Sequence, residues 1–215
     1  MNFIFKGRMW LAIEFALLFF GIPTWIFLDQ DFIHPSIIIL PVLVFIFILL
    51  RRNSDFKWSE LIRWGVSRKM LYTNAILIVL AALLMLGYVF FFEPENLFNL
   101  PRTNIWLYLG LCLFYPVFSA FGQEIIYRTF LSRRYSVILP RGWQFVLASA
   151  LTFSFMHIVF YNPLAMILTF TGGIYFAVNY RITRSVLFTS ILHGIFGIMM
   201  FGAGLGQYFW LDMPL

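Results

Sequence analysis

Residues 70–92 read MLYTNAILIVLAALLMLGYVFFF and contain no charged side chain. A helix of about 20 apolar residues spans the hydrocarbon core of a bilayer, so this stretch predicts a transmembrane helix. Further apolar stretches predict spans at about 9–28, 35–50, 106–134, 143–160, 163–180 and 185–204, of which 35–50 is short. The expected fold class is therefore an all-α, polytopic transmembrane helix bundle of about seven spans.

The composition agrees with a membrane-embedded chain. Of the 215 residues, 62% are hydrophobic and only 11% are charged, whereas soluble domains carry about 25% charged residues. The single cysteine, Cys112, excludes a disulfide framework and a cysteine zinc cluster. No cleavable signal peptide, linker or internal repeat is evident. We therefore expect residues 1–215 to form a single integral membrane domain.

The net charge of +6 does not point to nucleic acid, because the basic residues lie between the apolar stretches, where they set topology. If the N-terminus is cytoplasmic, all of the 15 basic residues except Arg102 fall on the inner side. The acidic residues assigned to outer segments are Asp29, Asp31, Glu93, Glu95 and Asp212. This distribution predicts seven spans with the N-terminus inside and the C-terminus outside. Glu14, in the first span, is expected to pair with Arg8 or to extend toward the interface.

Three ionisable residues remain deep inside predicted spans, namely Glu124, His157 and His193. Such a residue at the centre of a membrane helix costs roughly 2.5–3.5 kcal/mol or more, so it indicates a functional site. At about 1.5 Å per residue, Glu124 and His193 each lie about 14 Å from the basic end of their helix. The three side chains are therefore expected to meet near the middle of the bilayer, in a cavity that opens toward the cytoplasm.

Residues 121–131 read FGQEIIYRTFL and surround the first of these residues. Glu124 and Arg128 are four residues apart, so they share a helix face and can form an ion pair. Gln123 is adjacent, and Tyr127 is expected on the same side. A purely structural ion pair and a catalytic site both remain open for this segment alone.

The motifs resemble the CAAX prenyl protease and bacteriocin-processing family of intramembrane proteases. They are Gln123-Glu124-x-x-x-Arg128, Phe153-x-x-x-His157 and His193-x-x-x-Gly197, in the family's order, and the resemblance covers about residues 104–204. It implies that Glu124 and His157 activate a water molecule, that His193 stabilises the oxyanion, and that Arg128 holds the first motif together. Gln123, Tyr127, Phe153 and Gly197 would support the site.

Two positions depart from the family pattern. The family places a first glutamate, the presumed base, where this chain has Gln123, and an oxyanion-stabilising asparagine where it has Gly197. Either Glu124 takes over as base and another donor replaces the asparagine, or the chain is a non-catalytic relative that binds or regulates a membrane partner. A glutamate-type mechanism and a metal-dependent one both remain open, since two histidines and a glutamate match a zinc site with an open position.

The expected function is an intramembrane endopeptidase acting on a membrane-associated peptide or lipoprotein within a lipid bilayer. The bacterial inner (cytoplasmic) membrane is the expected location, and no nucleic-acid partner is expected. A transporter is disfavoured because the chain lacks paired broken helices and repeats. The chain also lacks the His-Glu-x-x-His sequence of classical zinc proteases.

Overall fold

A computed structural model describes residues 7–28, 35–52 and 56–209, although not the side chains of 35–40. Throughout these described parts every regular element is a helix. The prediction of an all-α polytopic bundle is confirmed, because six helices are long and apolar enough to cross a membrane. They comprise residues Arg8–Leu28, Arg68–Phe92, Ile105–Arg134, Gly142–Phe160, Pro163–Thr183 and Val186–Ala203.

Three of these spans are single helices and three are joined from shorter elements. The single helices are α4 (Arg68–Phe92), α10 (Pro163–Thr183) and α11 (Val186–Ala203). The joined elements are α1 (Arg8–Ala16), η1 (Leu17–Gly21) and α2 (Ile22–Leu28); α6 (Ile105–Phe114), η4 (Tyr115–Ala120), α7 (Phe121–Glu124), η5 (Ile125–Phe130) and α8 (Leu131–Arg134); and α9 (Gly142–Met156) and η6 (His157–Phe160). Short elements η2 (Trp58–Ile62), η3 (Pro94–Asn96), α5 (Asn99–Thr103) and η7 (Leu205–Phe209) lie between or after the spans.

The predicted span at 35–50 corresponds to α3 (Pro35–Arg51), which has 17 residues. At about 1.5 Å per residue it rises about 25 Å, which is less than the roughly 30 Å hydrocarbon core. The count of seven spans and the orientation of the termini therefore stay predictions. Three of the acidic residues on which the orientation depends, Asp29, Asp31 and Asp212, lie outside the described residues.

The segments assigned to the inner side meet at one end of the bundle. Arg133 forms an ion pair with Glu60 of η2, and the hydroxyl of Ser185 donates to the carbonyl of Arg63 at 2.5 Å. Arg134 Nε donates to Glu14 at 2.8 Å. The expectation that Glu14 pairs with Arg8 is therefore wrong, because α8 brings a second arginine closer.

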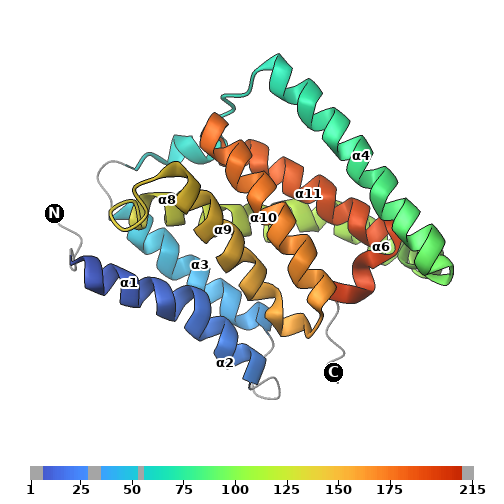
Figure 1. Ribbon diagram of the computed structural model, residues 1–215, viewed down its shortest axis with the longest axis horizontal. Helices are drawn as coiled ribbons and strands as arrows, with labels where there is room; N and C mark the ends of the chain where they lie inside the picture. Colours follow the sequence, from blue (N-terminus) through green and yellow to red (C-terminus); the bar gives the residue numbers. More distant parts are fainter. Residues whose placement is uncertain (1–6, 29–34, 53–55, 210–215) are drawn as a thin grey trace.

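Figure 1 shows α9 and α10 in the middle of the bundle, α1 to α3 along one side, and α4 at the opposite edge beside α11. Only Asn74 and Val89 of α4 are buried. Asn74 accounts for the polar contact of this helix with the bundle, since its Nδ2 donates to Asn179 of α10 at 3.1 Å. After the basic residues at its start, α4 exposes mainly apolar side chains, as expected for a helix that faces lipid.

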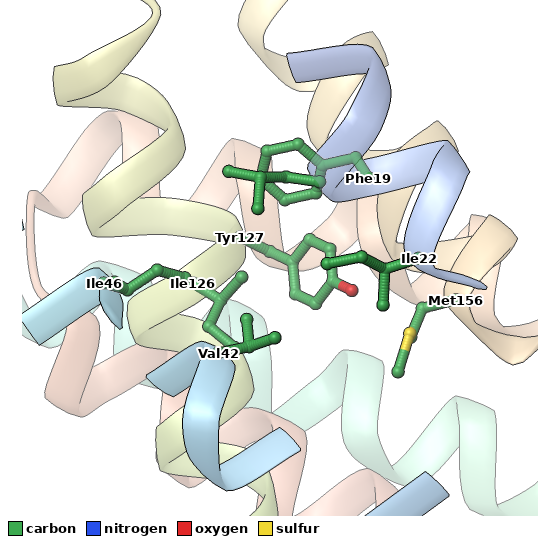
Figure 2. A pocket seen from close by; sticks show the side chains of 8 residues that line it. Phe19, Ile22, Val42, Ile46, Ile126, Tyr127 and Met156 are labelled. Carbon is green, nitrogen blue, oxygen red and sulfur yellow. The ribbon is translucent and has the colours of Figure 1, made fainter. Parts of the chain in front are cut away.

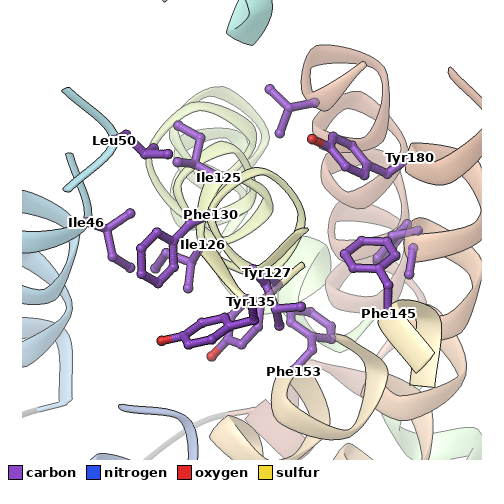
Figure 3. Packing of buried hydrophobic residues seen from close by; sticks show 14 of the residues in the cluster. Ile46, Leu50, Ile125, Ile126, Tyr127, Phe130, Tyr135, Phe145, Phe153 and Tyr180 are labelled. Atoms are coloured by element: carbon purple, nitrogen blue, oxygen red, sulfur yellow. The ribbon is translucent and has the colours of Figure 1, made fainter. Parts of the chain in front are cut away.

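The densest packing surrounds η5 and α8, where aromatic side chains from several helices meet (Figure 3). The ring of Tyr127 meets that of Phe153 edge-on, with centroids 5.3 Å apart, and Phe130 meets Tyr135 at 5.7 Å. Such edge-to-face pairs contribute about 0.5–1.5 kcal/mol beyond the area they bury. This rigid packing holds the segment that carries Glu124.

A glycine lets α9 and α10 approach closely. A Cβ atom at Gly173 would lie 2.9 Å from the Cα of Ala150, whereas one at Gly172 would lie 3.4 Å from the ring of Phe176. We expect Gly173→Ala to lower the free energy of unfolding by about 1–3 kcal/mol through overpacking. Gly172→Ala should be neutral or stabilising by up to about 1 kcal/mol, because alanine favours helix.

Unfolding of both glycine variants by sodium dodecyl sulfate, followed by circular dichroism, checks this prediction. Equal stability of the two variants would contradict the packing of α9 against α10 described above.

Candidate active site

The span that carries Glu124 contains two π-helical turns, η4 and η5, one on each side of α7. Pro116 lies in the first turn of η4, and proline lacks an N–H and clashes with the carbonyl four residues earlier. A widened turn relieves that clash. Such π turns occur frequently at functional sites because they alter the direction of the side chains that follow.

Glu124 and Arg128 form the predicted ion pair, and neither side chain has any exposed surface. Arg128 Nε lies 3.0 Å from Glu124 Oε2, and Arg128 Nη2 donates to Oε1 at 3.3 Å. The Nε–H bond is not aimed at Oε2, so the first contact is an ion pair without a hydrogen bond. Among the described residues, Glu124 Oε2 therefore accepts no hydrogen bond and keeps an acceptor lone pair.

Arg128 also ties α9 and α10 to the site. Its Nη1 donates to the hydroxyl of Ser149, and that hydroxyl donates to the carbonyl of Tyr127 at 2.7 Å. The guanidinium lies over the rings of Phe153 and Phe176, 5.4 and 5.9 Å from their centroids. These cation–π contacts are strongest where water is excluded, as it is around this side chain.

His193 of α11 contacts Glu124 directly, with Nδ1 at 3.2 Å from Oε1. An ionised carboxylate only accepts hydrogen bonds, so Nδ1 carries the proton. In a neutral imidazole, Nε2 is then an acceptor, and the hydroxyl of Tyr115 lies 3.1 Å from it. The imidazole also stacks on Phe176, at 4.9 Å between centroids and 18° between planes. The contacts with Glu124, Tyr115 and Phe176 together fix the orientation of the His193 imidazole.

His157 begins η6, immediately after α9, and is half-buried. Its Nδ1 lies 2.7 Å from the carbonyl of Phe153, so this nitrogen is the donor and Nε2 keeps its lone pair. The ring of Phe153 separates the two histidines, 4.9 Å from His157 and 5.3 Å from His193 between centroids. In the described part of the chain, no hydrogen bond joins His157 to Glu124 or His193.

Two of the predicted supporting side chains point elsewhere. Gln123 Nε2 donates to the hydroxyl of Ser119 at 2.8 Å, one turn earlier in the same span. The ring of Tyr127 lines an apolar cavity with Phe19, Ile22 and Met156 (Figure 2). Tyr127 therefore does not share the face of Glu124, contrary to the prediction, because the π turn η5 begins between them and rotates the later side chains.

Gly197 is covered by an aromatic ring that sequence reasoning missed. A Cβ atom there would lie 2.2 Å from Tyr115 Cε1 and 2.8 Å from the Tyr115 hydroxyl oxygen. Ser149, the partner of Arg128, was missed as well. Two features of the sequence could have indicated these residues. Tyr115 and Ser149 each place a hydroxyl group within an apolar span, and Tyr115 is followed by a proline.

A zinc site requires at least three donor side chains close together. No three His, Cys, Asp or Glu side chains within 7–28, 35–52 and 56–209 lie close enough to hold a metal ion. Glu124 and His193 are in contact, but among the described residues His157 makes no hydrogen bond or ion pair with either, and its Nδ1 is held by the carbonyl of Phe153. We therefore derive no step of the reaction through a metal.

Residues 104–199 match the family model described as Type II CAAX prenyl endopeptidase Rce1-like, and this segment contains Glu124, Arg128, His157 and His193. This part of the chain is therefore similar to that family. The resemblance inferred from the motifs is thereby confirmed. No curated protein and no solved structure matches the chain. The match to the CAAX prenyl endopeptidase family model and the six apolar helices found in the described residues together support an integral membrane endopeptidase.

Proposed function

We propose that the chain is an intramembrane endopeptidase that hydrolyses a peptide bond with water activated by Glu124 and His157. The observation that carries this proposal is the hydrogen bond between Glu124 and His193, buried within a segment that matches a protease family model. A buried ion pair alone would need no histidine. The departures at Gln123 and Gly197 motivate the non-catalytic alternative, which the match to a protease family does not favour.

His157 is the proton acceptor in this proposal, because Nε2 has a free lone pair and Nδ1 is held by the Phe153 carbonyl. A histidine in general acid–base catalysis contributes about 10²- to 10⁴-fold to the rate. Glu124 Oε2 can accept the second hydrogen of the same water through its unused lone pair. Glu124 would thus orient the water, and it would also hold Nδ1–H of His193.

Peptide hydrolysis at this site needs no reactant besides the peptide and water. Water gives a proton to His157 Nε2 while its oxygen attacks the carbonyl carbon, and the carbonyl oxygen becomes an oxyanion. His157 then returns the proton to the leaving amine nitrogen as the C–N bond breaks. His193 is assigned to the oxyanion side of the site because it lies across Phe153 from His157.

Substrate access requires movement of side chains, because Glu124 and Arg128 have no exposed surface. Gln123 and His157 are half-buried and form the more accessible edge of the site. A water-filled cavity at membrane depth is tolerated only where protein encloses it. Opening at this edge would admit an extended peptide, and water as far as Glu124 Oε2, while Arg128 stays covered.

The proposed substrate is a membrane-associated peptide or lipoprotein, since the site lies among helices able to cross a membrane. The small chain and its single predicted core favour the bacterial inner (cytoplasmic) membrane as the location. Prenylated peptides ending in a CAAX sequence are the first substrates to test, because the matching family is described by that activity.

The experiment is cleavage by purified protein reconstituted in liposomes, with prenylated CAAX peptides and a broad lipopeptide library. We expect wild type to cleave at least one peptide, with products identified by mass spectrometry, and His157→Ala to reduce the rate by about 10²- to 10⁴-fold. Circular dichroism must show that the variant remains folded. If folded wild type cleaves nothing in the library, the protease proposal fails.

A further inference from the structure

The hydroxyl of Tyr115 lies 3.1 Å from His193 Nε2, on the far side of the imidazole from Glu124. The three groups therefore form a line of carboxylate, imidazole and phenol. Because Glu124 fixes the proton of His193 on Nδ1, the Tyr115 hydroxyl is the donor to Nε2. With its one proton on Nδ1, a neutral imidazole at His193 has no second N–H with which to stabilise an oxyanion. A donor must come from another group.

Tyr115 reaches this place through two local features. In a regular α-helix, nine residues turn the chain by about half a revolution, at 3.6 residues per turn, so residues 115 and 124 would face opposite ways. The π turn η4 begins at Tyr115 and changes that relation. Gly197 provides the room, since a Cβ atom there would lie 2.2 Å from the tyrosine ring.

Ring packing holds the Tyr115 hydroxyl beside His193. The ring of Tyr115 meets His193 edge-on at 6.0 Å and Phe201 at 5.9 Å, which fixes the direction of the hydroxyl. Pro116 packs against Gly194, where a Cβ atom would lie 2.9 Å from Pro116 Cβ. Two glycines of α11, one directly after His193 and one a turn later, thus accept two consecutive residues of η4. This packing keeps the phenol beside the imidazole.

We propose that Tyr115 is a catalytic residue whose hydroxyl donates the hydrogen bond that stabilises the oxyanion formed during peptide hydrolysis. This inference rests on the proposed function. The O–H bond rotates about the Cζ–O bond from Nε2 toward the oxyanion, so no covalent bond is made or broken at the tyrosine. A hydrogen bond to an anion is roughly twice as strong as one between neutral groups, which favours the rotation only when the charge develops.

Tyr115→Phe tests this role, because it removes the hydroxyl and keeps the ring that covers Gly197. We expect kcat to fall about 10²- to 10³-fold, as on loss of one oxyanion donor, with KM within about twofold of wild type. Thermal unfolding should be unchanged within the error of the measurement. A merely structural tyrosine would lower stability and leave the kcat of the folded enzyme unchanged.

Tyr108→Phe is the matched control. Tyr108 lies on the same span and covers Gly202, where a Cβ atom would be 2.6 Å from the tyrosine oxygen. Its hydroxyl does not contact His193, so kcat should stay at the wild-type value. A second readout is the ¹⁵N resonance of His193 Nε2, which should shift in Tyr115→Phe and stay in place in Tyr108→Phe.

The outcomes separate the two proposals. If wild type cleaves peptides and Tyr115→Phe cleaves them equally fast, the role of Tyr115 is overturned while the protease function stands. An unchanged ¹⁵N resonance in Tyr115→Phe overturns the hydrogen bond itself. Complete absence of cleavage by wild type overturns the protease function and the catalytic role of Tyr115 together.

Discussion

Arg128→Met is expected to lower the free energy of unfolding by about 3–5 kcal/mol, the usual result of removing one partner from a buried ion pair. The substitution leaves Glu124 charged, with no exposed surface and without its ion-pair partner, although the hydrogen bond from His193 stays. It also removes the donor to the hydroxyl of Ser149. Unfolding in sodium dodecyl sulfate, followed by circular dichroism, measures the difference.

Arg133→Met is the matched control for this prediction. Arg133 lies on the same span, five residues later, and also pairs with a glutamate, Glu60. Both side chains of that pair are partly exposed, 26% and 35%, so its loss should cost no more than about 1 kcal/mol. Equal destabilisation by Arg128→Met and Arg133→Met would show that burial of the Glu124 ion pair has been misjudged.

The double variant Glu124→Gln with Arg128→Met removes both charges. Replacing a buried ion pair by neutral groups of similar volume is often neutral or stabilising. We expect the double variant to regain most of the stability lost in Arg128→Met. A double variant as unstable as the single one would mean that the cost lies in lost packing around Ser149 and Phe153, and not in the unpaired charge.

The parts of the site that sequence reasoning predicted follow from two general constraints. The spacing of four residues predicts the pair of Glu124 and Arg128 in any helix. Because an ionisable group in lipid is costly, Glu124 and His193 are expected to contact each other. In the structure, His193 Nδ1 lies 3.2 Å from Glu124 Oε1. Neither argument depends on the detailed course of the backbone.

The parts that were missed depend on that course. Tyr115 was missed and Tyr127 was placed on the wrong face because η4 and η5 are π turns, and one extra residue in a turn changes which side chains share a face. The role of Ser149 needed the packing of α9 against η5, which no spacing in the sequence encodes. Whether α3 crosses the bilayer does not follow from the sequence, because its 17 residues are close to the minimum length for a transmembrane helix.

Hydrolysis is expected to fall by about 10²- to 10⁴-fold in Glu124→Gln, because the amide can neither orient water as a carboxylate does nor accept the Nδ1–H of His193 as strongly. The single variant leaves Arg128 buried and unpaired, so its loss of activity would be confounded with loss of stability. The double variant with Arg128→Met separates the two effects. It should be stable and still inactive.

Glu14→Gln is the control for the loss of a paired carboxylate, since Glu14 accepts hydrogen bonds from Arg134 and Tyr135 at the end of the bundle. Its rate of cleavage should equal that of wild type, measured on the same peptide in the same liposomes. If the stable double variant also cleaves at the wild-type rate, Glu124 only holds Arg128 in place. Water activation would then belong to His157 alone, because Gln123 has no carboxylate and donates instead to Ser119.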